Sequence, residues 1–179
     1  VSPTEADGLA TSGPGRVIAL SNVNNPYSNQ SFMLGHGTWT GNTSHNASNY
    51  TARVKVDGNT VSLWSGDNTA SATIQHLALT CSASPSNVVD IKFYLDGNLV
   101  DSYSNTVSNS NIFSQFSNAS VLSIGSEIDG EKKAPGGYYL GAIYNRALTQ
   151  QEVQTNFNEG VVPISNGHSV PQIVNINVP

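Results

Sequence analysis

The sequence contains few charged residues. Asp, Glu, Lys and Arg make up 11% of the 179 residues, against about a quarter in an average soluble domain. Neutral side chains supply the polarity instead, with 21 Asn and 37 Ser plus Thr. This composition is common in secreted β-proteins and in viral surface proteins, so we expect an extracellular, cell-surface or virion-surface location.

Two kinds of segment are absent. The seven Lys and Arg are scattered and the net charge is −5. Because binding to phosphates needs clustered cations, we do not expect nucleic acid as a partner. No apolar run approaches the roughly 20 residues of a membrane span. The chain starts at Val1 without a signal peptide, so we expect a removed leader or a piece of a longer protein.

Cysteine occurs once, as Cys81 in the apolar run 74–81. A lone cysteine makes no internal disulfide, and no second thiol or His cluster near it indicates zinc. We interpret Cys81 as a small buried hydrophobe, with a catalytic thiol as the alternative. The four histidines lie far apart and form no metal-binding spacing.

Five Asn-x-Ser/Thr sequons start at Asn29, Asn42, Asn46, Asn49 and Asn118. About four are expected by chance in a chain this rich in Asn, Ser and Thr. The sequons therefore do not indicate glycosylation.

Short runs of alternating polar and apolar residues predict many β-strands. Residues 50–56 are the clearest, with Tyr50, Ala52, Val54 and Val56 on one face. Asp57-Gly58 and Asp96-Gly97 each separate two such runs and predict type I′ hairpins. Further strands are expected at residues 16–21, 31–36, 73–80, 88–95, 121–125 and 138–144. So many short strands predict an all-β sandwich or barrel.

One segment near the C-terminus predicts a short helix. Thr149 and Glu152 have the spacing of a capping box, and Leu148 and Val153 that of a hydrophobic staple. Gly160 is placed to end the helix. Two turns of helix are not stable alone in water, so we expect this helix to pack on the sandwich.

Three motifs in chain order resemble the closing half of laminin-G-like, concanavalin-A-like jelly rolls. The hairpin at residues 94–100 is similar to the family's Tyr-x-Asp-Gly hairpin, and residues 122–126 to its Leu-x-Ile-Gly strand. Residues 141–153 resemble the strand that runs through Tyr-Asn-Arg-Ala-Leu-Thr into a short helix. Residues 76–80 also resemble the family's strand before the hairpin. The resemblance implies a two-sheet antiparallel jelly-roll sandwich with one short C-terminal helix.

We expect this jelly roll to span residues 1–163, with residues 1–15 as an arm or linker. Residues 164–179 form a tail, predicted to be an edge strand of the same sheet or an inter-subunit strand. The fold implies function only loosely, because lectins, adhesion modules, virion proteins and glycanases share it.

The acidic run at residues 127–131 suggests two kinds of site. Its Glu-x-Asp-x-Glu pattern resembles the motif that carries the nucleophile and acid/base of one glycanase family, with Glu127 and Glu131 in those roles. The turn-rich run 130–137 favours instead a solvated loop in which Glu131 lies near a lysine. Glu127 and Asp129 are also candidate calcium ligands, although calcium needs six to eight oxygens.

Aromatic side chains are the candidates for ligand contact. Sugar recognition uses an aromatic platform flanked by amides and carboxylates, and Trp39 and Trp64 each suit that role or plain packing. Tyr138 and Tyr139 are predicted to point to opposite faces of one strand.

We therefore predict a non-catalytic surface module that binds carbohydrate, such as a surface glycan, or another surface partner. A decoration, spike or fibre subunit that assembles with copies of itself is the first alternative. A glycoside hydrolase that uses Glu127 and Glu131 is the second.

Overall fold

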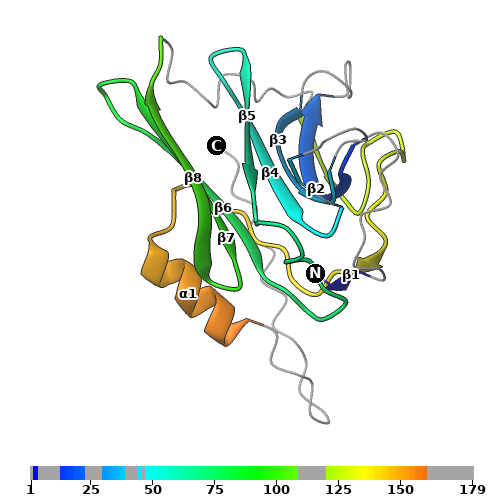
Figure 1. The fold of residues 1–179 in the computed structure, drawn as a ribbon. Helices are drawn as coiled ribbons and strands as arrows, with labels where there is room; N and C mark the ends of the chain where they lie inside the picture. The colour runs from blue at the N-terminus through cyan, green and yellow to red at the C-terminus, as the bar shows by residue number, and fades with distance from the viewer. Residues whose placement is uncertain are drawn as a thin grey trace.

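The computed structural model describes residues 2–3, 13–22, 30–38, 44–45, 47–108 and 120–160. Within them, two antiparallel sheets form a jelly-roll sandwich, with one short helix at its end (Figure 1). This confirms the predicted fold class. The five-stranded sheet has the order β5-β4-β3-β2-β9 and the three-stranded sheet the order β6-β7-β8.

The five-stranded sheet contains β2 (Gly15–Asn22), β3 (Gln30–His36), β4 (Tyr50–Val56), β5 (Asn59–Trp64) and β9 (Ser120–Ile124). The three-stranded sheet contains β6 (Leu77–Ala83), β7 (Val88–Leu95) and β8 (Asn98–Thr106). A short ladder pairs β1 (Ser2–Pro3) with β10 (Gly136–Gly137). The helix α1 covers Gln150–Glu159.

The core lies between the two sheets and follows the predicted alternation. Tyr50, Ala52, Val54 and Val56 of β4 are buried, together with Ile91 and Phe93 of β7. Thr51, on the other face of β4, is buried as well, and its hydroxyl donates a hydrogen bond of 2.9 Å to the Gly37 carbonyl. The outer face of the five-stranded sheet is therefore partly covered rather than fully open.

Both predicted Asp-Gly hairpins are confirmed as type I′ turns. Asp57 and Gly58 have φ of 50° and 77°, and Asp96 and Gly97 have the same two values. Positive φ at both central residues matches the right-handed twist of the flanking strands. In each turn the Asn that follows donates from its side chain to the Asp carbonyl.

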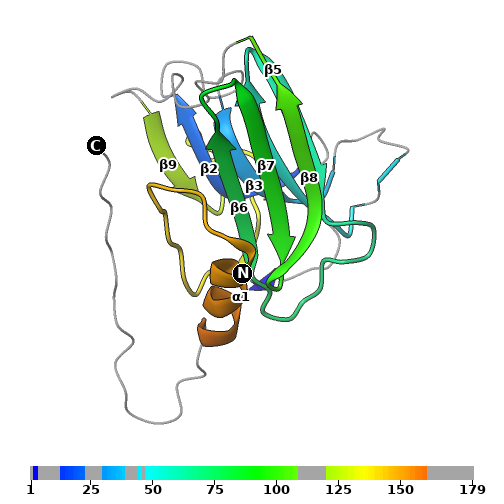
Figure 2. The same cartoon turned by 90° about the vertical axis from the view of Figure 1, so that its left-hand side faces the viewer.

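Helix α1 begins as predicted. Thr149 accepts a hydrogen bond from the Glu152 amide, while the Glu152 carboxylate accepts one from the Thr149 amide. Val153 is fully buried, and Gln150 donates to the Gly97 carbonyl at 2.7 Å. The helix thus packs against the turn between β7 and β8, at the lower end of the small sheet in Figure 2. Gly160 follows it in an extended conformation.

Two predicted strands differ in the structure. β6 begins at Leu77 rather than residue 73, because Gln75 bonds the backbone of Thr69 and Ser71 and holds this segment as a loop.

The strand predicted at residues 138–144 is wrong, since regular pairing stops at Gly137. Side-chain bonds hold the segment instead: Tyr138 donates to the Ala134 carbonyl, and Tyr144 accepts from Asn156 of α1.

The predicted domain limits remain predictions. Of the expected arm, the structure describes Ser2 and Pro3 in β1 and residues 13–15 leading into β2. The tail at residues 164–179 lies outside the described residues.

Candidate functional site

The acidic run lies in a loop at residues 125–134, which we call the acidic loop. Glu127 sits inside it, and its Oε1 accepts hydrogen bonds from Nε and Nη2 of Arg16 at 2.9 and 2.5 Å. The side chains of Arg16 and Glu127 are 5% and 1% exposed, so this is a buried ion pair. Burial lowers the pKa of Arg16, and the charge and hydrogen bonds of Glu127 oppose that shift.

This geometry corrects the expectation of a solvated loop for Glu127, although Asp129 and Glu131 are exposed as expected. The loop closes on itself, because the Glu127 amide donates to the Glu131 carbonyl at 2.8 Å. Residues 127–131 therefore form turns, not a strand. The alternation that would place Glu127 and Glu131 on one strand face is not formed.

Calcium at Glu127 and Asp129 stays a prediction. Arg16 already occupies one oxygen of Glu127, and Asp129 Oδ1 accepts the Glu131 amide at 3.0 Å. Within the described ranges, no group of three or more His, Cys, Asp or Glu is placed to hold a metal ion.

The structure describes one of the two tryptophans that are candidates for ligand contact. Trp39 lies outside the described residues. Trp64 stacks on His45 with ring centroids 4.3 Å apart and 17° between the planes. His45 lies 3.7 Å from the Asp67 carboxylate. One face of the Trp64 ring is thus already occupied within the protein, so at most its other face is available to a ligand.

Tyr138 and Tyr139 are both on the surface, with exposed fractions of 39% and 53%. Tyr138 is anchored through its hydroxyl to the Ala134 carbonyl, and burial of that hydroxyl raises its pKa. The ring of Tyr139 lies over Gly137. Their exposure fits ligand contact, but they belong to an irregular segment and not to one strand.

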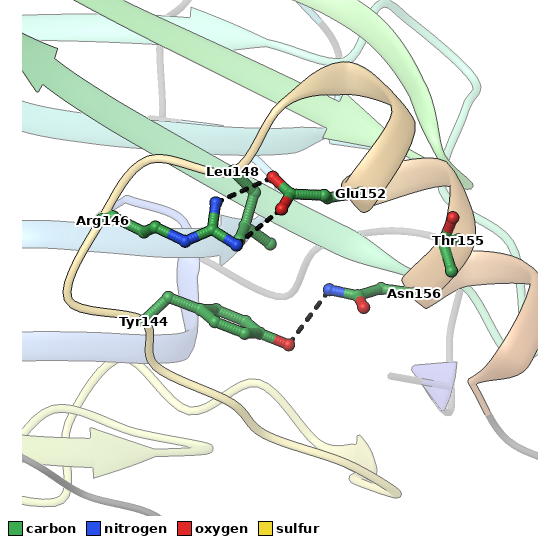
Figure 3. Close-up of a pocket in the computed structure, with 6 residues that line it drawn as sticks. All are labelled: Tyr144, Arg146, Leu148, Glu152, Thr155 and Asn156. Carbon is green, nitrogen blue, oxygen red and sulfur yellow. Dashed lines mark hydrogen bonds and ion pairs between the residues drawn. The ribbon is translucent and has the colours of Figure 1, made fainter.

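A shallow pocket of about 170 Å³ lies where this segment meets α1, and we call it the Tyr144 pocket (Figure 3). Tyr144 forms one wall with a ring that is 48% exposed, and its hydroxyl accepts a hydrogen bond of 3.1 Å from Asn156. The pocket is lined by Tyr144, Arg146, Leu148, Glu152, Thr155 and Asn156. It combines an exposed aromatic ring with amide, hydroxyl, carboxylate and guanidinium groups.

An ion pair fixes the pocket opposite Tyr144. Arg146 donates to both oxygens of Glu152, at 2.8 and 2.6 Å. The hydrogen bonds from Arg146, with those from Thr149, lower the pKa of Glu152 to about 2. The carboxylate is therefore charged at neutral pH, where it forms the ion pair with Arg146.

Sequence reasoning missed this pocket. Glu152 and Asn156 are four residues apart on the helix, and Thr155 lies beside them, so all three share one face. That spacing was visible in the sequence. Tyr144 and Arg146 were assigned to the predicted strand at residues 138–144 and to the family motif, which hid their position against α1.

Cys81 lies on the core face of β6, opposite Ile91 of β7. Part of the residue is exposed, but burial of the sulfur raises the pKa of the thiol to about 12. We expect the native protein to react with a disulfide reagent at pH 8 at least about 100-fold more slowly than the unfolded chain, because the thiolate is the reactive form. Equal rates in buffer and in guanidinium chloride would contradict the buried interpretation.

The sequon at Asn49 is inaccessible in the folded chain. Asn49 is fully buried, and its backbone carbonyl accepts the Gly37 amide at 2.8 Å. The other four sequons start outside the described residues.

Comparison with family models gives a match over most of the chain. A family model described as the concanavalin A-like lectin/glucanases superfamily matches residues 14–154. A search of curated proteins found no match. A solved structure of an S-layer domain-containing protein from Clostridium thermocellum is similar, with 16% sequence identity and a TM-score of 0.37. The similarity covers 83% of this chain and 65% of that one.

In the described part of the chain, no helix has the length and apolar character needed to cross a membrane.

Proposed function

Because the chain belongs to the concanavalin A-like lectin/glucanase superfamily, we propose that it is a non-catalytic module that binds carbohydrate at the Tyr144 pocket. The observation that carries this proposal is the half-exposed Tyr144 ring beside an amide and a hydroxyl side chain. An aromatic face packs against the C–H groups of a sugar ring, while amides and hydroxyls bond its hydroxyl groups.

The polar groups around Tyr144 support recognition rather than catalysis. The Glu152 carboxylate is held by Arg146 and by the Thr149 cap, so it is not poised to transfer a proton. Asn156 positions the Tyr144 hydroxyl from the next turn of α1. Together with the low overall charge, these features favour an extracellular, cell-surface or virion-surface module whose partner is a surface glycan.

A glycan array tests this function directly. We expect the protein to bind at least one glycan, and Tyr144→Ala to weaken that binding roughly 30-fold, the effect of losing a central aromatic contact of about 2 kcal/mol. Tyr144→Phe keeps the ring and should retain most of the affinity. Tyr139→Ala, an equally exposed tyrosine outside the pocket, is the matched control.

The outcomes separate the alternatives. Loss of binding with Tyr139→Ala but not with Tyr144→Ala would move the site, whereas no binding to any glycan would overturn the carbohydrate function. Repeating the array in EDTA tests the predicted calcium at Glu127 and Asp129. Release of reducing sugar that Glu131→Gln abolishes would favour the glycoside hydrolase alternative.

A structural subunit is the second candidate, and exposed apolar side chains favour it. Leu140 and Ile143 in the irregular segment are exposed, as are Val121 and Ile124 of the edge strand β9. Exposed apolar surface of this kind is often an interface. Concentration-dependent self-association in light scattering would support assembly with copies of the chain.

A further inference from the structure

A second pocket, of about 250 Å³, lies on the outer face of the three-stranded sheet, and we call it the sheet pocket. Strand register explains its composition: Thr80 pairs with Lys92 and Ser82 with Asp90, so these four side chains form a square across β6 and β7. Their neighbours along each strand, Cys81 and Ile91, point into the core. The square is therefore an outward-facing polar surface.

The sheet pocket adjoins the Tyr144 pocket. Ala147, Leu148 and Thr149 close its remaining side, and Leu148 lines both pockets. The segment that leads into α1 therefore contributes Leu148 to both pockets, and we call residues 146–149 the ridge. Thr149 is fixed in this ridge by the capping box, and Arg146 by its ion pair with Glu152.

The charges in the two pockets balance. Arg146 and Glu152 neutralise each other in the Tyr144 pocket, and the sheet pocket holds one cation and one anion, Lys92 and Asp90. The other lining groups are the Tyr144 ring, hydroxyls, an amide and aliphatic carbons. Neither pocket offers the excess positive charge that would favour a carboxylated, sulfated or phosphorylated ligand.

We propose that the two pockets are adjacent subsites for a neutral oligosaccharide of at least two sugar units, which crosses the ridge at Leu148. This inference rests on the proposed function and names its ligand class. Each pocket is smaller than the roughly 300 to 1,000 Å³ of a drug-sized site, so each suits one sugar ring. The Tyr144 ring packs on one unit, and Thr80, Asp90 and Lys92 bond the hydroxyl groups of the next.

Chain length and charge of the ligand provide the test. The probes are glucose, mannose, galactose, xylose and N-acetylglucosamine, each as a series from one to six units, with galacturonic acid oligomers and sialylated glycans as acidic probes. We expect binding to a neutral series, with affinity rising at least tenfold from one unit to two.

Variants of the sheet pocket separate the subsites. Asp90→Asn and Thr80→Val should reduce binding of the dimer toward that of the single unit, whereas Tyr144→Ala weakens binding of both the dimer and the single unit. Ser104→Ala on β8, which faces Asp90 across the ladder but lies outside the pocket, is the matched control. Equal melting temperatures show that the variants remain folded.

Three results would overturn the inference while leaving the proposed function intact: affinity independent of chain length, stronger binding of acidic probes, or an Asp90→Asn variant with normal dimer affinity. Absence of binding to every probe would remove the proposed function itself.

Discussion

Replacement of Glu127 by alanine is expected to lower the free energy of unfolding by about 3 to 5 kcal/mol, because it leaves a buried arginine without its counter-charge. Arg16 is held at 4% exposure, and two of its nitrogens donate to one Glu127 oxygen. Its remaining guanidinium nitrogen, Nη1, donates to the Pro14 carbonyl at 2.5 Å, so the guanidinium cannot turn toward solvent without breaking that bond too.

Chemical denaturation measured by circular dichroism would give the change, with Glu131→Ala as the control from the same loop. This control removes an exposed carboxylate, for which a change within about 0.5 kcal/mol is usual. The double variant Arg16→Met with Glu127→Leu removes both charges and should recover most of the loss. A Glu127→Ala protein as stable as the control would mean that the pair is hydrated in solution.

The parts of the fold that the sequence predicted are those fixed by local chemistry. The Asp-Gly pairs at positions 57–58 and 96–97 favour a tight hairpin without contacts to distant residues. Both turns adopt positive φ at both residues. The capping box at Thr149 and Glu152 likewise depends on residues three apart. The alternation in β4 predicted which four side chains enter the core.

The parts that the sequence did not predict depend on residues far apart in the chain. Arg16 and Glu127 are separated by 111 positions, and only the packing of the acidic loop on β2 brings them together. For the same reason the solvated-loop interpretation was wrong for Glu127. The Tyr144 pocket depends on the irregular segment lying against α1. The apolar alternation of that segment, at residues 138–144, had predicted a strand instead.

Gly15→Ala is expected to destabilise the protein by about 3 kcal/mol, because a new methyl group would meet backbone atoms that cannot move independently. A Cβ at Gly15 would collide with the Lys133 carbonyl oxygen and lie 3.1 Å from the Ala134 Cα. Next to Gly15, the Arg16 amide donates to the Lys132 carbonyl at 2.7 Å, so displacing this part of the loop also breaks a β2 contact.

Gly58→Ala is the matched control, since Gly58 has φ of 77° in an open hairpin turn with no atom within 4 Å of a new Cβ. It should cost only the left-handed backbone strain, about 1 kcal/mol. The collision at Gly15 also moves the loop that carries Glu127. The Gly15→Ala and Glu127→Ala losses should therefore be less than additive, because either change alone already disturbs the same ion pair. Two results together would contradict this packing of the acidic loop on β2. Gly15→Ala would lower the free energy of unfolding no more than Gly58→Ala does, and the effects of Gly15→Ala and Glu127→Ala would be fully additive. The buried Arg16–Glu127 pair would then need another explanation for its burial.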